Sequence, residues 1–102
     1  MSHKDFYGIS AVKYDEDYTH IDYVRQHLIS QGRVDSGQVV PRLTVIANVH
    51  NGIVYRTISQ SPNGSWNVGA VVQIIHVKGI DYIRADGNLT PQDSLGQLPL
   101  FW

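Results

Sequence analysis

A two-residue connection, Lys78-Gly79, separates two strand-like runs over residues 66–77 and 80–85. Such a short connection between apolar runs is typical of a β-hairpin, because glycine adopts a positive φ at little steric cost. Two earlier runs, 6–14 and 21–29, also carry β-branched and aromatic residues at alternate positions and are joined by a polar stretch. The sequence therefore predicts two hairpins, which favours a fold built on an antiparallel sheet.

The middle of the chain has a less uniform pattern. Residues 53–59 alternate again and end at the turn sequence Ser61-Pro62-Asn63-Gly64. Residues 41–50 fit either a buried strand or a short helix; the proline at their start and Asn51-Gly52 after their end favour the helix. Residues 30–38 are rich in glycine and serine, so we expect a surface loop there.

The composition indicates a single packed domain over residues 1–102, with a flexible N-terminus at 1–5. Hydrophobic residues make up 42% of the chain and charged residues 17%, which is close to the average for globular proteins. The chain has no cysteine, so we expect neither a disulfide nor a thiolate-bound zinc. The lack of disulfides fits a reducing cytoplasm. No signal peptide and no apolar run of about 18 residues appear, so we expect a cytoplasmic protein without a membrane span.

These patterns together predict a small α+β domain. We expect a curved antiparallel sheet of about four to six strands with one short helix. The end of the chain is strongly apolar, and such a tail is expected to dock on a face or an edge of the sheet. The tail residues expected to do so are Leu98, Pro99, Phe101 and Trp102.

The C-terminal half carries a specific motif. Residues 82–88 read Tyr-Ile-Arg-Ala-Asp-Gly-Asn, and residues 93–99 read Asp-Ser-Leu-Gly-Gln-Leu-Pro. These segments, together with the opening hairpin around residues 9–17, resemble the domain of unknown function 3892 family, an uncharacterised bacterial group. The resemblance implies a bacterial or phage protein with a helix in its middle segment, and it implies no activity, since none is assigned to the family. The residues that depart from the family's usual motif are Ala85, Ser94 and Gln97.

The polar residues of this motif are where we expect a site. Oxygen-bearing side chains around a glycine could bind a hard cation, and Arg84 could pair with a carboxylate of a partner. Alternatively, Asp and Asn side chains in such a segment bond to their own backbone and hold turns, which is the more frequent role. The candidates for partner binding are Tyr82, Arg84, Asp86, Asn88, Asp93, Phe101 and Trp102.

The sequence has no recognisable pattern of catalytic or metal-binding residues. Its five histidines lack the spacing of metal ligands. A serine nucleophile elbow, a phosphate-binding glycine loop and a dinucleotide fingerprint are also absent from the sequence. We therefore predict no catalytic residues, no metal, no cofactor and no enzymatic activity. The alternative is a small enzyme whose active-site pocket is assembled from residues scattered along the sequence.

The leading hypothesis is a non-enzymatic binding or adaptor domain that contacts another protein, with homo-oligomerisation left open. The apolar tail would become the partner site if it is not packed on its own sheet. The alternative is single-stranded nucleic-acid binding through tyrosine and arginine side chains that share strand faces, such as Tyr23 with Arg25. The formal net charge of −1 and the neighbouring Asp22 and Asp81 disfavour nucleic acid as the partner.

Overall fold

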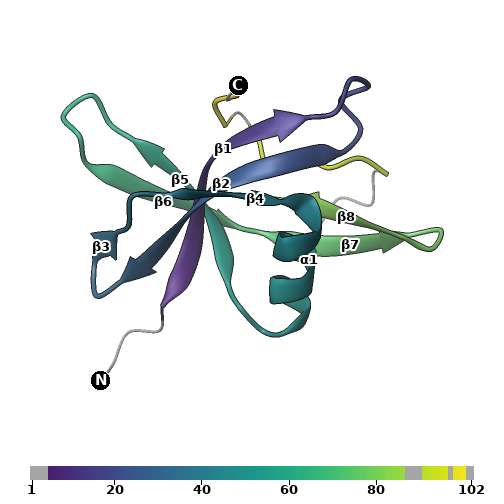
Figure 1. Ribbon diagram of the computed structural model, residues 1–102, viewed down its shortest axis with the longest axis horizontal. Helices are drawn as coiled ribbons and strands as arrows, with labels where there is room; N and C mark the ends of the chain where they lie inside the picture. Colours follow the sequence, from purple (N-terminus) through teal and green to yellow (C-terminus); the bar gives the residue numbers. More distant parts are fainter. Residues whose placement is uncertain (1–4, 87–90, 97, 101–102) are drawn as a thin grey trace.

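The computed structural model describes residues 5–86, 91–96 and 98–100 of the chain. The fold is a small, mostly-β α+β domain with a curled large sheet, a second small sheet and one helix among the described residues, as predicted (Figure 1). The elements follow the order β1 (Phe6–Tyr14), β2 (Ile21–Ser30), β3 (Arg33–Val34), β4 (Gln38–Pro41), α1 (Arg42–His50), β5 (Tyr55–Gln60), β6 (Trp66–Val71), β7 (Gln73–Val77) and β8 (Ile80–Arg84).

The large sheet has six strands, in the order β3-β2-β1-β5-β6, with β4 also paired to β2. β1 and β2 form the first predicted hairpin, and β5 and β6 pair on either side of the predicted turn at residues 61–64. β1 and β5 run parallel, however, which differs from the expected antiparallel sheet. The chain passes through β2, β4 and α1 between these two strands, and a connection of that length permits a parallel pair. Residues 30–38 are exposed over most of their length, and they also contain the short strand β3.

The second predicted hairpin is confirmed at its turn and corrected in its first strand. β7 and β8 pair across Lys78 and Gly79, whose φ angles of 50° and 82° are the positive values that a two-residue turn needs. The strand expected over residues 66–77 is divided at Val72, which is buried and donates its N–H to the carbonyl of Tyr55 at 2.8 Å. β6 therefore joins the large sheet, whereas β7 forms a separate two-stranded sheet with β8.

α1 confirms the helical interpretation of residues 41–50. Pro41 is its N-cap residue and has extended backbone angles; its missing N–H costs little there, because the first N–H groups of a helix have no intrahelical partner. The helix ends where the Asn51 N–H donates to the carbonyl of Ala47 at 3.1 Å and Gly52 takes a φ of 86°. A membrane-crossing helix is not found in the described part of the chain.

The core joins one face of the large sheet to α1, β8 and the C-terminal segment. Leu95 is fully enclosed in it, and Leu98 packs against it. The Val12 N–H donates to the carbonyl of Pro99 at 3.0 Å, so the end of the chain also pairs with β1. The predicted docking of the tail is thus confirmed as far as residue 100, while Phe101 and Trp102 lie outside the described residues. The buried core residues are Ile9, Val12, Ile21, Val24, Val40, Val45, Ile46, Tyr55, Val72, Ile83 and Leu95.

A buried carboxylate connects the two sheets with the helix. The side chain of Asp93 has no solvent exposure, and its oxygens accept the backbone N–H groups of Ile21 and Ile83, each at 2.7 Å. Arg42, at the start of α1, donates to the same carboxylate from Nε at 2.7 Å and from Nη2 at 3.2 Å. The Arg42 guanidinium also donates to the backbone carbonyl of Asp81. Asp93 thereby holds β2, β8 and α1 together, and we call this set of contacts the Asp93 junction.

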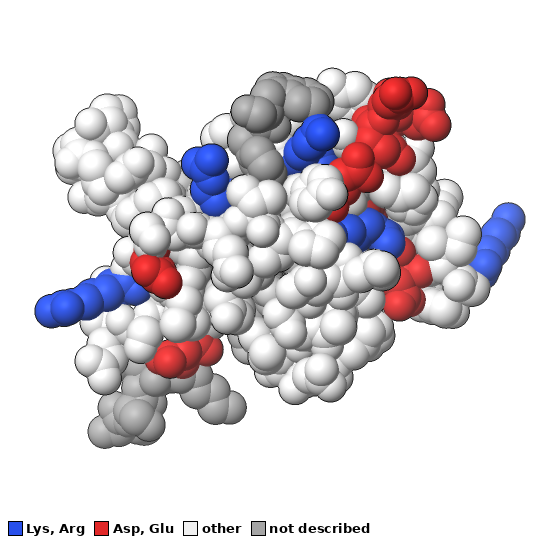
Figure 2. All heavy atoms as spheres, in the orientation of Figure 1, with Lys and Arg blue, Asp and Glu red and all other residues white. Residues whose placement is uncertain are grey.

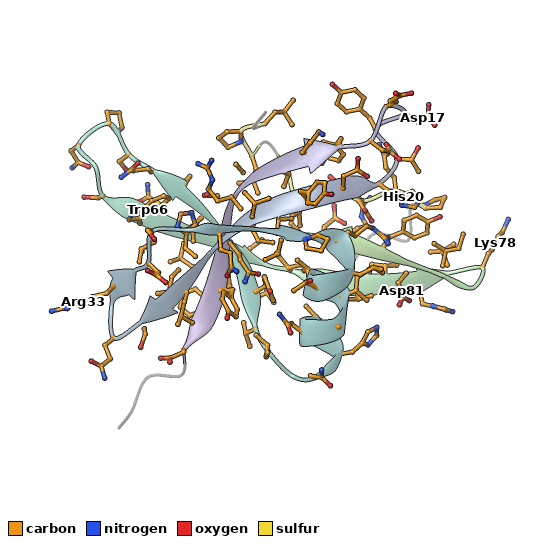
Figure 3. All side chains as sticks on the ribbon, viewed as in Figure 1. Asp17, His20, Arg33, Trp66, Lys78 and Asp81 are labelled. Carbon is orange, nitrogen blue, oxygen red and sulfur yellow. The ribbon has the colours of Figure 1, made fainter. Side chains whose placement is uncertain are left out.

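A second carboxylate, Asp81 on β8, lies near the surface between two histidines (Figure 3). His76 on β7 places Nδ1 2.7 Å from Oδ1 of Asp81, and His50 at the end of α1 places Nε2 3.3 Å from Oδ2. These hydrogen bonds, the one from His76 first, lower the pKa of Asp81 below its ordinary value of 3.8. The ionised form of Asp81 therefore links the end of the helix to the small sheet.

Replacing Asp93 by asparagine tests the Asp93 junction. The Asp93→Asn variant leaves the Arg42 guanidinium without its buried counter-charge, and we expect it to lose about 3 kcal/mol of unfolding free energy. Urea unfolding followed by circular dichroism measures the change. Asp17→Asn, in the exposed loop after β1, is the control and should change the unfolding free energy by less than about 0.5 kcal/mol. If Asp93→Asn costs no more than this control, the junction does not carry the stability assigned to it.

Acid unfolding tests the Asp81 cluster. Because the pKa of Asp81 is lower in the folded than in the unfolded chain, its stabilising effect is present above about pH 4 and is lost as the pH falls through the folded value. Asp81→Asn should therefore be less stable than the parent at neutral pH and should lose less unfolding free energy below about pH 4. Asp22→Asn, on the exposed side of β2, is the control. Identical acid dependence in the parent and Asp81→Asn would rule out this linkage.

Candidate functional site

The structure places the predicted partner-binding residues on β8 and in the segment after it. Tyr82 and Arg84 are buried, with 6% and 7% of their surface exposed. The Tyr82 ring stacks on His20, with centroids 5.5 Å apart and planes 7° from parallel. Arg84 donates from Nε to Oδ1 of Asp86 at 2.7 Å and from Nη1 to the carbonyl of Gln92 at 2.8 Å. Asp86 is exposed and Asp93 is enclosed in its junction, while Asn88, Phe101 and Trp102 lie outside the described residues.

These contacts agree with the alternative that the polar side chains of the C-terminal motif bond within the chain itself. Arg84 ties β8 to the segment that follows it, and the Ala85 N–H donates to the carbonyl of Ser94 at 2.8 Å along the same path. The hydrogen bond to Asp86 raises the pKa of the Arg84 guanidinium, so Arg84 is a cation in this contact. A role of the motif in partner binding stays a prediction.

Few of the tyrosine and arginine side chains considered for nucleic-acid stacking are exposed. Tyr55 and Tyr82 are buried, and Arg84 is buried with them. Tyr23 is 43% exposed on β2, with the exposed Arg25 two residues further on. The nucleic-acid alternative therefore depends on a small basic and aromatic patch on β2.

The face of the large sheet opposite the core carries an apolar groove. We call this face the open face. Gly8 on β1 lies beneath two of the residues that line the groove, because a Cβ at Gly8 would come within 2.7 Å of the Ile58 side chain and 2.9 Å of the Ile29 side chain. Only glycine lets these two side chains pack directly over β1. The groove has a volume of about 390 Å³, and its apolar lining is Phe6, Ile29, Val34, Ile58, Trp66 and Val68.

The curl of the sheet brings its two ends together over this face. Trp66, at the start of β6, lies with its ring centroid 5.3 Å from that of His27 on β2, although β1 and β5 separate the two strands in the sheet (Figure 3). The two planes are tilted by 51°, between a stacked and an edge-to-face contact. Trp66 thus forms one end wall of the groove and partly closes the curled sheet.

One edge of β6 is free of strand pairing. β6 pairs with β5 on one side, and within the described residues no strand pairs with its other side. The sequence of β6 has no charged residue and no proline, and the whole stretch 57–77 contains no aspartate, glutamate, lysine or arginine. Val68 and Val71 are 50% and 46% exposed on this strand. Figure 2 shows acidic side chains over the loop between β1 and β2, whereas the hairpin between β5 and β6 carries no charge.

Sequence reasoning assigned no site to the open face. Its lining comes from β1, β2, β3, β5 and β6, so no local motif marks it. The available signal is the run 57–77, which has no aspartate, glutamate, lysine or arginine. It contains a strand that begins with tryptophan, which is unusual for an exposed hairpin. Among the described residues, no three histidine, aspartate or glutamate side chains are placed to hold a metal ion.

Comparison with known proteins identifies a family. The family described as "Protein of unknown function (DUF3892)" matches residues 8–99, which include all of the large sheet except the first two residues of β1, and the C-terminal motif. Neither the curated proteins nor the solved structures yield a match. The predicted family is thereby confirmed, and the chain belongs to the DUF3892 family.

Proposed function

We propose that this domain binds an extended segment of a partner protein, which adds as a strand to the free edge of β6. The observation that carries the proposal is an uncharged, unpaired edge strand directly beside an apolar groove. Backbone hydrogen bonds along β6 would supply affinity, and alternate side chains of the partner would enter the groove.

The chemistry of the edge supports a partner strand. Unpaired N–H and C=O groups on an edge attract any extended chain, and monomeric proteins usually protect such edges with lysine, proline or an inward charge. β6 has none of these, because it reads Trp-Asn-Val-Gly-Ala-Val. A register shift breaks the pairing near Gly69, whose carbonyl accepts hydrogen bonds from Nε and Nη2 of Arg56 at 3.1 and 2.7 Å. The accessible part of the edge is therefore residues 66–68.

The groove defines the chemistry of the partner segment. Its lining is apolar and offers aromatic contact from Trp66 and Phe6. Side chains two residues apart on an added strand point to the same face, so the partner should carry apolar residues at alternate positions and little charge. A single added strand makes a small interface, for which we expect a Kd on the order of 1–100 µM.

We further propose that this binding takes place in the cytoplasm of a bacterium or of a phage-infected cell. The absence of cysteine supports a reducing compartment, and the resemblance to a bacterial family supports the source. Self-association through the same edge would use a second copy of β6 as the added strand.

A charge in the centre of the edge should abolish the interaction. Val68→Lys places an ammonium group beside the apolar groove, and we expect the affinity for a bound peptide to fall by at least about 10-fold. Short random peptides displayed on phage provide the ligands, and titration calorimetry of the selected synthetic peptides gives the Kd. Leu43→Lys, a residue 72% exposed on α1, is the matched control and should bind as the parent does.

Three results would overturn the proposal. The first is that selected peptides bind the parent and Val68→Lys equally. The second is that the amide signals shifted by peptide in NMR spectra lie away from β6. The third is a concentration-dependent dimer in sedimentation that Val68→Lys dissolves, which would assign the edge to a second copy of the chain instead of a partner.

A further inference from the structure

We infer that Ser10 is an activated nucleophile, with His27 as its general base, on the open face of the large sheet. Ser10 Oγ lies 2.7 Å from Nε2 of His27, and Nδ1 of the same ring lies 2.8 Å from the backbone carbonyl oxygen of Asp35. A nucleophile bonded to a base that is itself oriented by a third group is the arrangement on which serine catalysis depends. The inference is independent of the proposed peptide binding.

The carbonyl of Asp35 fixes the tautomer of His27. A carbonyl oxygen has no proton to give, so Nδ1 of His27 must carry the proton and donate it. In the neutral ring, Nε2 is then unprotonated and accepts the hydroxyl proton of Ser10. This is the tautomer that a general base for Ser10 requires. A carbonyl stabilises the imidazolium less than a carboxylate does, so the activation is weaker than in a complete triad.

The surroundings of His27 hold its ring in this orientation. The residue is 6% exposed, and the Trp66 ring packs against it. On the other side a Cβ at Gly37 would lie 2.7 Å from Cε1 of the ring, and Gly37 itself has a φ of 96°. The backbone therefore approaches the imidazole as only glycine can. A ring confined in this way keeps its hydrogen bonds, whereas an exposed histidine would rotate among rotamers.

A bulge in β1 sets the position of Ser10 on the open face. The pairing with β2 passes from Ile9 opposite Gln26 to Ala11 opposite Arg25, which leaves Ser10 as an extra residue. Bulges often re-aim a side chain beside an active site. Ser10 is partly exposed.

The groove and the Ser10–His27 pair share one face of the sheet. Phe6, Gly8 and Ser10 alternate along β1, and Gly8 and Phe6 lie opposite His27 and Ile29 of β2. The Trp66 side chain lines the groove and also packs against the His27 ring. Ser10 and His27 do not line the groove themselves, so an apolar group would approach the hydroxyl of Ser10 from the groove along Trp66.

The substrate class that fits is an ester with a small apolar acyl group. Ser10 Oγ would attack the ester carbonyl carbon while Nε2 of His27 takes the hydroxyl proton and returns it to the leaving alcohol. This forms a new ester between the acyl group and Ser10, and breaks the bond to the alcohol. Water, deprotonated by Nε2, then attacks the acyl-serine, releases the carboxylic acid and restores the hydroxyl of Ser10.

Labelling with a fluorophosphonate, which reacts with activated serines, tests the inference. We expect a single adduct by intact-mass spectrometry, mapped to Ser10 by peptide sequencing. Ser10→Ala should abolish the adduct, and His27→Gln should slow its formation by at least about 100-fold. Ser59→Ala, an exposed serine on β5, is the matched control and should label at the parent rate.

No adduct on the parent protein, an adduct on another residue, or an equal rate in a folded His27→Gln variant would each overturn the inference. Circular dichroism establishes whether His27→Gln is folded. If that variant does not fold, the parent protein still decides the question, because stoichiometric labelling of Ser10 alone supports an activated hydroxyl and an unlabelled parent excludes it.

Discussion

Asp93 places a carboxylate with no solvent exposure at the point where β2, β8 and α1 meet. Burying a charge is costly unless hydrogen bonds and a counter-charge compensate it, and here two backbone N–H groups and the guanidinium of Arg42 do so. These partners lie far apart in the sequence, so the contact forms only when the C-terminal segment has docked. The position of the helix and of the small sheet on one face of the large sheet depends on this junction.

That arrangement divides the large sheet into two unlike faces. The core face is covered by α1, β8 and the tail, whereas the open face keeps an apolar groove under the curl of the sheet. The groove adjoins a strand edge without charge or proline, and its lining residue Trp66 packs against His27, the partner of Ser10. This one face therefore carries two distinct proposed functions. The free edge of β6 suits an extended peptide, and the Ser10 hydroxyl beside His27 suits the hydrolysis of an ester.

The sequence predicts those features that depend on neighbouring residues. The hairpins and α1 follow from alternation, from the Lys78-Gly79 turn and from the proline at the helix start. The break at Val72 could not be predicted, because it depends on a hydrogen bond to Tyr55 in another strand. The parallel pairing of β1 with β5 and the contact of Ser10 with His27 are likewise long-range. The sequence places a candidate site in the polar C-terminal motif, and in the structure Arg84 and Asp93 of this motif bond to the backbone and side chains of the chain itself.

Native-state hydrogen exchange measured by NMR tests the division into an anchored face and a free edge most directly. We expect the amides of Ile21 and Ile83, which donate to Asp93, to exchange as slowly as the amide of Val24 in the core of β2. We expect outward-facing amides in residues 66–68 of β6 to exchange far faster. Fast exchange at Ile21 and Ile83 would show that Asp93 does not anchor β2 and β8, and protection along the edge of β6 equal to that of the core would show that this edge is not free.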